Sequence, residues 1–564
     1  MSTELSFATD PHFYRHWRFD VDGTVATLTL DVDPAGGLHP GYELKKNSYD
    51  LGVYIELADA VQRLRFTYPQ VRAVVMTSAL DRMFSSGANI GMLAQAEHAF
   101  KVNFCKYCNE TLAAIEDATE SGQTYIAALN GTAAGGGYEM ALACEQILLA
   151  DDGSATVALP EVPLLGVLPG TGGLTRLTDK RGVRRDLADV FATTAEGIRG
   201  QRAMDWRLVD ETAKPTEFQA AARRLAERAI AESGDPPAAE AIGDAGVELP
   251  RLSCESGEDS WRYEHVVVEL DRRAATATLI ISGPDAAPPS MADLRDAGAA
   301  AWPLATAREL DDAISRLRFG EPELGTWLLK TTGNPAAVLA TDEILAAARS
   351  GGAPRDADDW LAGEIIGLWR RTLRRLEATS RSLIALIEPG SCFAGTLLEV
   401  ALAADRQYML DGIFEDGPAG QVPAAIVLGP MNAGALPTAS GSTRLVTRFG
   451  SASLAETPLA AAGKELAAAE AVELGLVTAA PDDLDWDDEL RLVISERAGF
   501  SPDALSGMEA SLRFGGPESM ATKIFGRLSA WQNWIFLRPN ASGPQGALRR
   551  YGTGQRADFD RKRV

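Results

Sequence analysis

The sequence predicts an α/β fold that is duplicated along the chain and followed by a helical segment. Strand-like runs of apolar or alternating residues are separated by longer stretches with apolar residues at helical spacing, which is typical of α/β domains. Four short segments of the first half also recur, in the same order, in the second half. With 564 residues the chain is too long for one ordinary domain. Both observations therefore favour two related units.

Strand and helix patterns alternate along the first half. Helical spacing covers 49–66, 94–116, 187–210 and 217–232, and strand patterns cover 25–30, 71–77 and 125–129. A stretch rich in Pro, Gly, Asp and Ser follows at 233–259, which is the composition of a linker. Strand-like sequence resumes at 265–281. The order indicates that a second unit begins there.

The recurring segments define the second copy. LADAVQRLRF (57–66) recurs as LDDAISRLRF (310–319), EMALACEQILLA (from Glu139) as EVALAADRQYML (from Glu399), LPGTGGLTRL (168–177) as LPTASGSTRL (436–445), and GQRAMDWRLV (200–209) as AAAEAVELGLV (467–477). We therefore predict a catalytic domain over 1–240, a linker over 241–262, a scaffold domain over 263–485 and a helical docking segment over 486–564. An aromatic cluster in that last segment is expected to pack against another surface; it comprises Trp531, Trp534 and Phe536.

Composition excludes several classes of function. The net charge of −24, from 54 basic and 78 acidic residues, argues against nucleic acids and anionic membranes as partners. No apolar run approaches the roughly 20 residues needed to span a bilayer, and the first residues lack a basic-then-apolar signal pattern. Five cysteines do not make a disulfide scaffold in a chain of this length. We therefore expect a cytoplasmic protein.

A run of three glycines, Gly135–Gly137, leads directly into an apolar helical stretch whose first turn holds Glu139. A bare glycine backbone at the start of a helix offers free N–H groups to an anion. Glu161, which follows Pro160, supplies a second carboxylate, and carboxylates beside an anion site suit proton transfer. The pattern predicts an oxyanion site with two acid/base groups.

The second copy has lost this chemistry. Gly395, Thr396 and Leu397 stand opposite the three glycines, and no carboxylate stands opposite Glu161. A side chain at Thr396 would crowd any ligand atom that approaches the backbone. We therefore expect the second copy to be a degenerate scaffold.

Three motifs of the first copy resemble those of the crotonase (enoyl-CoA hydratase/isomerase) superfamily. FSSGANIGML (84–93) is similar to its F-A-A-G-A-D-I loop, NGTAAGGGYEMALACE (130–145) to its N-G-x-x-x-G-G-G-x-E-L segment, and LPEVPLLGVLPGTGGLTRL (159–177) to its P-E-x-x-x-G-x-x-P-x-x-G-G-x-x-R-L segment. The similarity covers most of 20–230. It implies a spiral of ββα units and an acyl-CoA substrate whose thioester oxygen lies in an oxyanion hole.

Position by position, the resemblance implies that the backbone N–H groups of Ala88 and Gly136 form this oxyanion hole. It places Glu139 and Glu161 as the two acid/base groups, with either role open to each. Further contacts with the substrate or its CoA moiety are expected from Lys45, Arg82, Ser86, Asn89 and Gly135. The substrate itself carries coenzyme A and water is the reactant, so no cofactor is expected.

A double-length, ring-cleaving branch of the superfamily is the more specific resemblance, through LKKNSYDLGV (44–53) and QNWIFLRPN (532–540). It implies that the enzyme opens a dearomatised benzoyl-CoA ring, as the 2,3-epoxide or the 2,3-dihydrodiol, to 3,4-dehydroadipyl-CoA semialdehyde and formate. Hydration or isomerisation of a linear enoyl-CoA is the alternative, because the two glutamates alone permit it equally. The intact motifs of the first copy speak against a non-catalytic assembly subunit.

Two cysteines, Cys105 and Cys108, follow the FSSGAN loop. The ring-cleaving branch implies a cysteine base on this helix for deformylation, and Cys105 is the better candidate because Cys108 lies on a different face. A buried, inert cysteine is the alternative for each. The pair has no neighbouring Cys or His cluster that would offer zinc ligands, so no metal is expected. NAD is not expected either, because the glycines at 170–173 follow G-x-G-G spacing after a proline.

The expected partner is a small-molecule acyl-CoA, with neither nucleic acid nor membrane. We also expect a homodimer. The fused second copy could cover the face that a neighbouring subunit covers in the superfamily's trimers.

Overall fold

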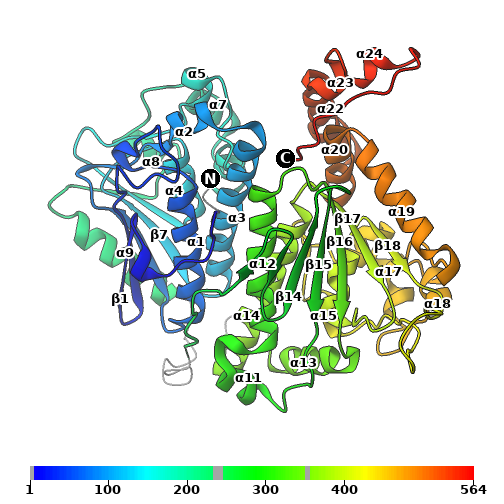
Figure 1. The fold of residues 1–564 in the computed structure, drawn as a ribbon. Helices are drawn as coiled ribbons and strands as arrows, with labels where there is room; N and C mark the ends of the chain where they lie inside the picture. Colours follow the sequence, from blue (N-terminus) through cyan, green and yellow to red (C-terminus); the bar gives the residue numbers. More distant parts are fainter. Residues whose placement is uncertain (1–4, 233–245, 350–355) are drawn as a thin grey trace. The chain divides into compact units, whose positions relative to one another are not determined.

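The computed structural model describes residues 5–232, 246–349 and 356–564. The chain divides into two compact units. We call Phe7–Arg251 with Ser350–Leu361 the N-terminal unit, and Met1–Ser6 with Leu252–Arg349 and Ala362–Val564 the C-terminal unit. Each contains a largely parallel sheet with helices, so the predicted α/β class is confirmed (Figure 1).

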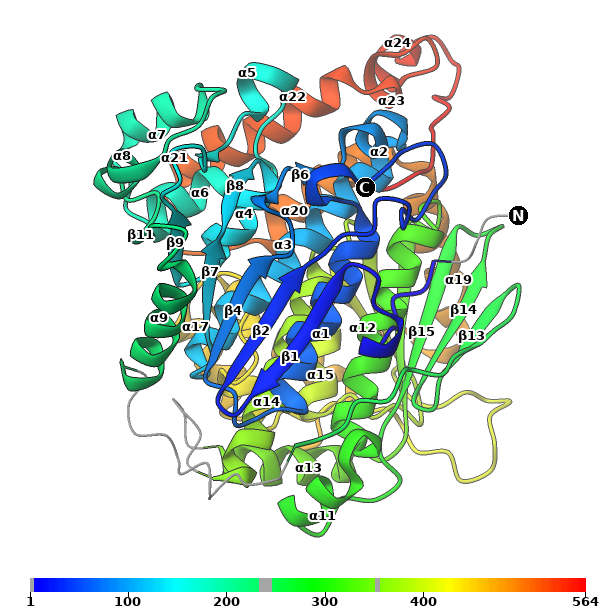
Figure 2. The same ribbon diagram turned by 90° about the vertical axis from the view of Figure 1, so that its left-hand side faces the viewer.

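The main sheet of the N-terminal unit has six strands in the order β1-β2-β4-β7-β9-β11. Only β1 runs antiparallel to its neighbour. Figure 2 shows β1, β2, β4 and β7 side by side. Every residue of β7 is buried, as expected for a central parallel strand. The bounds are β1 (Trp17–Asp22), β2 (Val25–Leu30), β4 (Ala73–Ser78), β7 (Thr124–Leu129), β9 (Gln146–Ala150) and β11 (Glu211–Ala213).

Two smaller sheets carry the loops that form the candidate site. One has the order β10-β8-β5, and the other pairs β3 with β6. All of these pairings are parallel. The strands are β3 (Ser48–Tyr49), β5 (Arg82–Ser85), β6 (Gly87–Ala88), β8 (Gly131–Ala134) and β10 (Val157–Ala158).

The long helices of the N-terminal unit follow the predicted pattern, with α1, α3 and α9 in place of 49–66, 94–116 and 217–232. The single helix predicted over 187–210 is wrong. Two short helices, α7 and α8, replace it because Gly197 and Gly200 have φ angles of 76° and 54° between them. The helices are η1 (Pro11–Phe13), η2 (Lys45–Asn47), α1 (Leu51–Phe66), α2 (Ile90–Gln95), α3 (His98–Glu120), α4 (Gly136–Ala143), α5 (Glu161–Leu165), α6 (Gly173–Thr175), η3 (Arg176–Lys180), α7 (Arg185–Ala192), α8 (Gly200–Asp205) and α9 (Phe218–Glu232).

The C-terminal unit repeats the same sheet. Its order is β12-β13-β14-β15-β16-β17-β18, with the pairs from β15 onward parallel. Thus β14 to β18 repeat the order and direction of β1, β2, β4, β7 and β9. The bounds are β12 (Glu255–Ser256), β13 (Ser260–Arg262), β14 (Val266–Asp271), β15 (Thr276–Ser282), β16 (Thr326–Thr332), β17 (Ser382–Ile387) and β18 (Arg406–Met409).

The predicted linker over 241–262 needs correction. Residues 241–245 lie outside the described part of the chain. The last residues of the predicted linker, 255–262, are part of the folded C-terminal unit, because β12 and β13 belong to its sheet and Trp261 is buried. The strand-like run at 265–281 is a hairpin of two strands, β14 and β15.

The helices of the C-terminal unit include a counterpart of each long helix near the site: α12 for α1, α14 for α3 and α15 for α4. Among the described residues, the first turn of α14 belongs to the N-terminal unit and the rest of that helix to the C-terminal unit. The helices are α11 (Met291–Ala297), η4 (Gly298–Ala300), α12 (Trp302–Gly320), α13 (Pro335–Ala348), α14 (Ala357–Glu377), α15 (Gly395–Leu402), η5 (Pro430–Ala433), α16 (Arg444–Phe449), α17 (Ala452–Leu459), α18 (Ala468–Glu473), α19 (Asp483–Gly499), α20 (Pro502–Arg513), α21 (Met520–Thr522), η6 (Lys523–Leu528), α22 (Ser529–Leu537), α23 (Pro539–Ser542) and α24 (Ala547–Arg550).

A buried glutamate fixes the start of the sheet in both copies. Glu56 of α1 accepts hydrogen bonds from the backbone N–H groups of Arg15, His16 and Trp17. Glu309 of α12 accepts them from His265 and Val266. The same device at the same place supports the duplication seen in the sequence.

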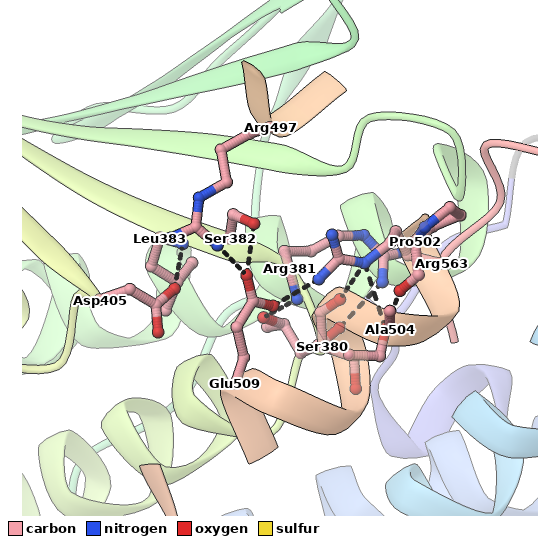
Figure 3. A network of polar contacts seen from close by, with 12 residues as sticks. Ser380, Arg381, Ser382, Leu383, Asp405, Arg497, Pro502, Ala504, Glu509 and Arg563 are labelled. Carbon is pink, nitrogen blue, oxygen red and sulfur yellow. Dashed lines mark hydrogen bonds and ion pairs between the residues drawn. The ribbon is translucent and has the colours of Figure 1, made fainter. Parts of the chain in front are cut away.

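The segment predicted to begin at 486 is joined to the C-terminal unit. Trp486 of α19 packs in a core with Ile384 and Tyr408 of the sheet. Figure 3 shows Glu509 of α20 at the centre of a polar network. Its carboxylate accepts a hydrogen bond from Ser382 and pairs with Arg497 at 3.0 Å and with Arg563. A buried carboxylate needs such partners, so this network anchors the segment to β17.

Within 5–232, 246–349 and 356–564, no helix combines the length and the apolar character that crossing a bilayer requires.

Candidate active site

The glycine run forms the turn into α4. Gly135 has a φ of 55°, and a Cβ atom there would lie 2.8 Å from Oε1 of Glu161. A side chain at Gly136 would overlap the hydroxyl of Tyr49. Glycine is therefore required at both positions by neighbouring side chains of the site. Tyr49 itself is buried against Tyr54 and Phe104.

The two predicted oxyanion donors come from adjoining strands and turns. A Cβ atom on Gly87 would lie 2.8 Å from the backbone N of Gly136, so β6 passes directly beside the start of α4. Asn89 donates its N–H to the Tyr49 carbonyl oxygen at 2.8 Å. Since N–H groups alternate along a strand, that of Ala88 points away from β3. The N–H of Gly136 has no acceptor among the described residues.

Glu139 lies in the first turn of α4 and is 2% exposed. Its carboxylate accepts hydrogen bonds from the backbone N–H groups of Thr171 at 2.9 Å and Gly173 at 2.8 Å, and from the Thr171 hydroxyl. Burial raises the pKa of Glu139, and these three donors oppose that shift. The donors favour the ionised form of the group.

Glu161 begins α5 and is also buried, but it is not held in the same way. Its Oε2 has no hydrogen-bond partner among the described residues. Burial, and then the charge of Glu139, raise the pKa of Glu161 to about 7. Two neighbouring carboxylates with unlike environments are the arrangement that separates an acid from a base.

The two cysteines differ as predicted. Cys105 is partly exposed, and its Sγ lies 3.6 Å from the position of a Cβ atom on Gly170. Burial, together with the charge of Glu139, raises the pKa of the Cys105 thiol to about 11. Cys108 is fully buried, and burial raises the pKa of its thiol well above the usual value. Cys105 is thus the cysteine beside Gly170, while the charge of Glu139 acts on both thiols.

The predicted contacts for substrate and CoA lie in different surroundings. Asn89 caps α2 through Met92 and donates both N–H groups of its side chain within the protein. Ser86 is exposed next to Lys45, with its Oγ 3.4 Å from the carbonyl oxygen of that residue. Lys45 pairs on the surface with Glu43, and Arg82 lies 4.0 Å from Asp152. Both cations are exposed, and a contact with CoA phosphate stays a prediction for each.

One group of possible metal ligands occurs in the part of the chain that the structure describes, in the C-terminal unit: Glu264, His265 and Glu309. Glu309 already accepts two backbone N–H groups there. Its position matches that of Glu56, so the group is part of the sheet's support.

Comparisons with known proteins show the family of the chain. The profile of the enoyl-CoA hydratase/isomerase family matches residues 43–241. The benzoyl-CoA-dihydrodiol lyase of Aromatoleum evansii is 53% identical over 566 residues, which cover 99% of this chain and 98% of that protein. The chain belongs to the enoyl-CoA hydratase/isomerase family.

Shorter members of the family match about two fifths of the chain. The carnitinyl-CoA dehydratase of Proteus mirabilis (strain HI4320) is 30% identical over 213 residues, covering 38% of this chain and 77% of that protein. Among solved structures, the enoyl-CoA hydratase of Geobacillus kaustophilus HTA426 is 35% identical with a TM-score of 0.34, covering 38% of this chain and 74% of that chain.

The second copy of this family member contains a carboxyl group of its own in the equivalent place, and burial raises the pKa of this group to about 7. Thr396, the counterpart of Gly136, donates its N–H to Asp342 at 2.7 Å and its hydroxyl to the same carboxylate at 2.6 Å. Asp342 is buried. The turn therefore binds a carboxylate in the second copy, which supports an anion site at Gly136 and excludes a substrate from Thr396.

Three residues of the site were missed in the sequence: Thr171, Arg176 and Glu116. Arg176 forms a bidentate pair with Glu116 at 2.8 and 2.9 Å and donates to the Thr171 carbonyl oxygen at 2.8 Å. The sequence did contain a signal for these residues, because two short motifs recur in both copies. The motif T-L-x-x-[IL]-E occurs at 111–116 and 372–377, and T-R-L occurs at 175–177 and 443–445.

Replacing Gly136 with Ala should lower kcat/KM by a factor of about 10² or more, because the new methyl group overlaps Tyr49 and displaces an oxyanion donor. Steady-state kinetics test this. Gly320→Ala is the matched control, since a Cβ atom there meets nothing within 4 Å. Equal activity of the Gly136→Ala and wild-type proteins would contradict the assignment.

Glu161→Gln should raise the melting temperature at pH 8 and leave it unchanged near pH 4. A carboxyl group whose pKa in the folded state is about 7, above its ordinary value of 4.5, destabilises the folded state once it ionises, whereas glutamine stays neutral. The expected gain at pH 8 is on the order of 1–2 kcal/mol. Calorimetry across this pH range checks the sign. A variant that is less stable than wild type at pH 8 would show that Glu161 is not held in a disfavoured charged state.

Proposed function

We propose that the protein is a carbon–carbon lyase that opens the ring of a 2,3-epoxide or 2,3-dihydrodiol of benzoyl-CoA. The products are 3,4-dehydroadipyl-CoA semialdehyde and formate, with water as reactant. The identity of 53% along the whole chain to a benzoyl-CoA-dihydrodiol lyase supports the substrate. The observation that carries the chemistry is the Gly136 N–H, which has no acceptor among the described residues and lies beside two buried carboxylates.

The oxyanion hole supplies the electron sink. Cleavage of a ring C–C bond leaves an electron pair that must be delocalised, and the thioester can take it as an enolate. The negative charge then lies on the thioester oxygen, where the N–H groups of Ala88 and Gly136 would stabilise it. Gly136 at the start of α4 adds the positive end of the helix dipole.

The surroundings of the two glutamates divide their roles. Glu139 accepts three hydrogen bonds and carries the charge of the pair, so it is the base that deprotonates water or a ring hydroxyl. Glu161, whose pKa is raised to about 7, retains a proton for a larger part of the time and is the proton donor.

Cys105 takes a different part from the one expected. A thiol with a pKa of about 11 is protonated at neutral pH, so it is a poor base in the free enzyme. We assign it to the deformylation step as a hydrogen-bond donor that contacts the departing carbon or its water.

The reaction as proposed requires substrate and water, without a resident cofactor or metal. We place the protein in the cytoplasm, because its five cysteines are all free, which suits a reducing compartment.

Turnover of two substrates tests this function. The wild-type protein should release formate from 2,3-epoxybenzoyl-CoA or the 2,3-dihydrodiol, and should hydrate crotonyl-CoA at least about 10²-fold less efficiently, because a pocket for an oxygenated ring does not hold a linear chain in a reactive position. Glu139→Gln and Glu161→Gln should each reduce ring cleavage about 10²–10⁴-fold. Formate and the semialdehyde are measured directly. Efficient crotonyl-CoA hydration without formate release would favour the hydratase alternative, and near-normal ring cleavage by either variant would reject its assigned role.

We further propose a homodimer. Apolar side chains between 520 and 551 are about half to nine-tenths exposed, and burial in a second copy would remove them from water: Met520, Phe525, Leu528, Phe536, Leu537, Leu548 and Tyr551. Sedimentation equilibrium should give twice the chain mass of 60.0 kDa. Phe525→Asp with Leu537→Asp should shift the protein to monomer. A stable hexamer, or a wild-type monomer at micromolar concentration, would contradict the proposal.

A further inference from the structure

The loop at 170–173, which we call the Thr171 loop, lies between an arginine and the catalytic carboxylate. On one side, Thr171 and Gly173 donate to Glu139. On the other side, Arg176 donates to the carbonyl oxygen of Thr171. The hydrogen bonds of the guanidinium therefore link it to Glu139 through the peptide of Thr171, while its charge also favours the ionised carboxylate.

The loop is held at several points by α3. Asn109 donates to the Gly170 carbonyl oxygen at 3.1 Å, and Glu116 fixes Arg176 by a bidentate ion pair. Gly172 has a φ of 91°, and any Cβ atom there would overlap Nη1 of Arg176. The glycine thus permits the loop to pass close to the guanidinium.

In the second copy, Asn432 and Arg444 donate to the equivalent glutamate, and the described residues of the corresponding loop, 438–441, do not. Arg444, the counterpart of Arg176, pairs directly with Glu399, the counterpart of Glu139, at 2.8 Å. It also pairs with Glu377, the counterpart of Glu116, at 2.8 Å. Asn432 donates to the remaining oxygen of Glu399. In that copy the carboxylate is part of a buried ion pair and is not available for proton transfer.

We propose that Thr171 and Arg176 are positioning residues of the N-terminal unit. Arg176, neutralised by Glu116, fixes the Thr171 loop, and the loop holds the Glu139 carboxylate away from the guanidinium so that it remains a base. This inference rests on the proposed function of Glu139. The Arg–Glu pair is present in both copies. The arginine fixes the Thr171 loop in the first copy and pairs directly with the glutamate of α15 in the second.

The titratable and charged groups around Glu139 determine which interactions affect its pKa. They are Arg176, Glu161, Cys105, Cys108, Tyr49 and Tyr54. Burial raises the pKa values of both thiols and both tyrosines, so these four stay neutral below pH 8. Glu161 and the charge of Arg176 are then the partners that affect Glu139 in the working range.

Two substitutions should move the acidic limb of the kcat/KM profile in opposite directions. Thr171→Val removes a hydroxyl that stabilises the charged form, so the limb should move to higher pH by about one unit. Glu116→Gln leaves the charge of Arg176 uncompensated, which favours ionised Glu139, so the limb should move to lower pH. Thr171→Ser keeps the hydroxyl and should keep the wild-type limb.

The matched control is Thr438→Val, the same change at a buried threonine of the second copy, which should leave the profile unchanged. A purely structural role would lower activity equally at all pH values, and unshifted limbs in both Thr171→Val and Glu116→Gln would overturn the inference. If the Thr171→Val protein does not fold, the Glu116→Gln protein is a sufficient test. An acidic limb of its kcat/KM profile that stays in place or moves to higher pH would overturn the inference. Absence of wild-type ring cleavage is a separate result, because it rejects the proposed function itself.

Discussion

The structure of the site depends on one hydrogen-bond donor, the backbone N–H of Gly136 at the start of α4, which donates to no acceptor among residues 5–232, 246–349 and 356–564. Glycine is required there because Tyr49 fills the space of a side chain, and Gly87 packs against the same peptide. The second copy shows what such a turn binds. There the N–H of Thr396 donates to the buried carboxylate of Asp342. A carboxyl oxygen therefore fits this position in the C-terminal unit, and we propose that the thioester oxygen takes the same position in the N-terminal unit.

The second constraint is the burial of charge around that donor. A carboxylate removed from water must be paired or hydrogen-bonded. The C-terminal unit satisfies Glu399 with the guanidinium of Arg444 in a buried ion pair. The N-terminal unit satisfies Glu139 with the neutral donors of Thr171 and Gly173 instead. One duplicated framework thus pairs its glutamate with an arginine in one copy and hydrogen-bonds it to neutral donors in the other, where we propose that it acts as a base.

Periodicity and repeats were enough to predict the fold class and the carboxylates of the site. The all-buried strand at 124–129 and the glycine run before Glu139 depend on local sequence, so local patterns identified them. Contacts between distant segments were not predicted. The hydrogen bonds from Thr171 to Glu139 span 32 positions, and the pair of Arg176 with Glu116 spans 60. The helix predicted over 187–210 was wrong because helical spacing continues across glycines that turn the chain.

The most direct test is a crystal structure of the protein with benzoyl-CoA, whose intact ring prevents turnover. We expect the thioester oxygen to lie within about 3 Å of the N–H groups of both Ala88 and Gly136, with the ring between Glu139 and Glu161. The C-terminal unit should hold no acyl group, because the N–H and the hydroxyl of Thr396 already donate hydrogen bonds to Asp342. A thioester oxygen bound elsewhere, or an acyl group in the C-terminal unit, would contradict the assignment of the active site.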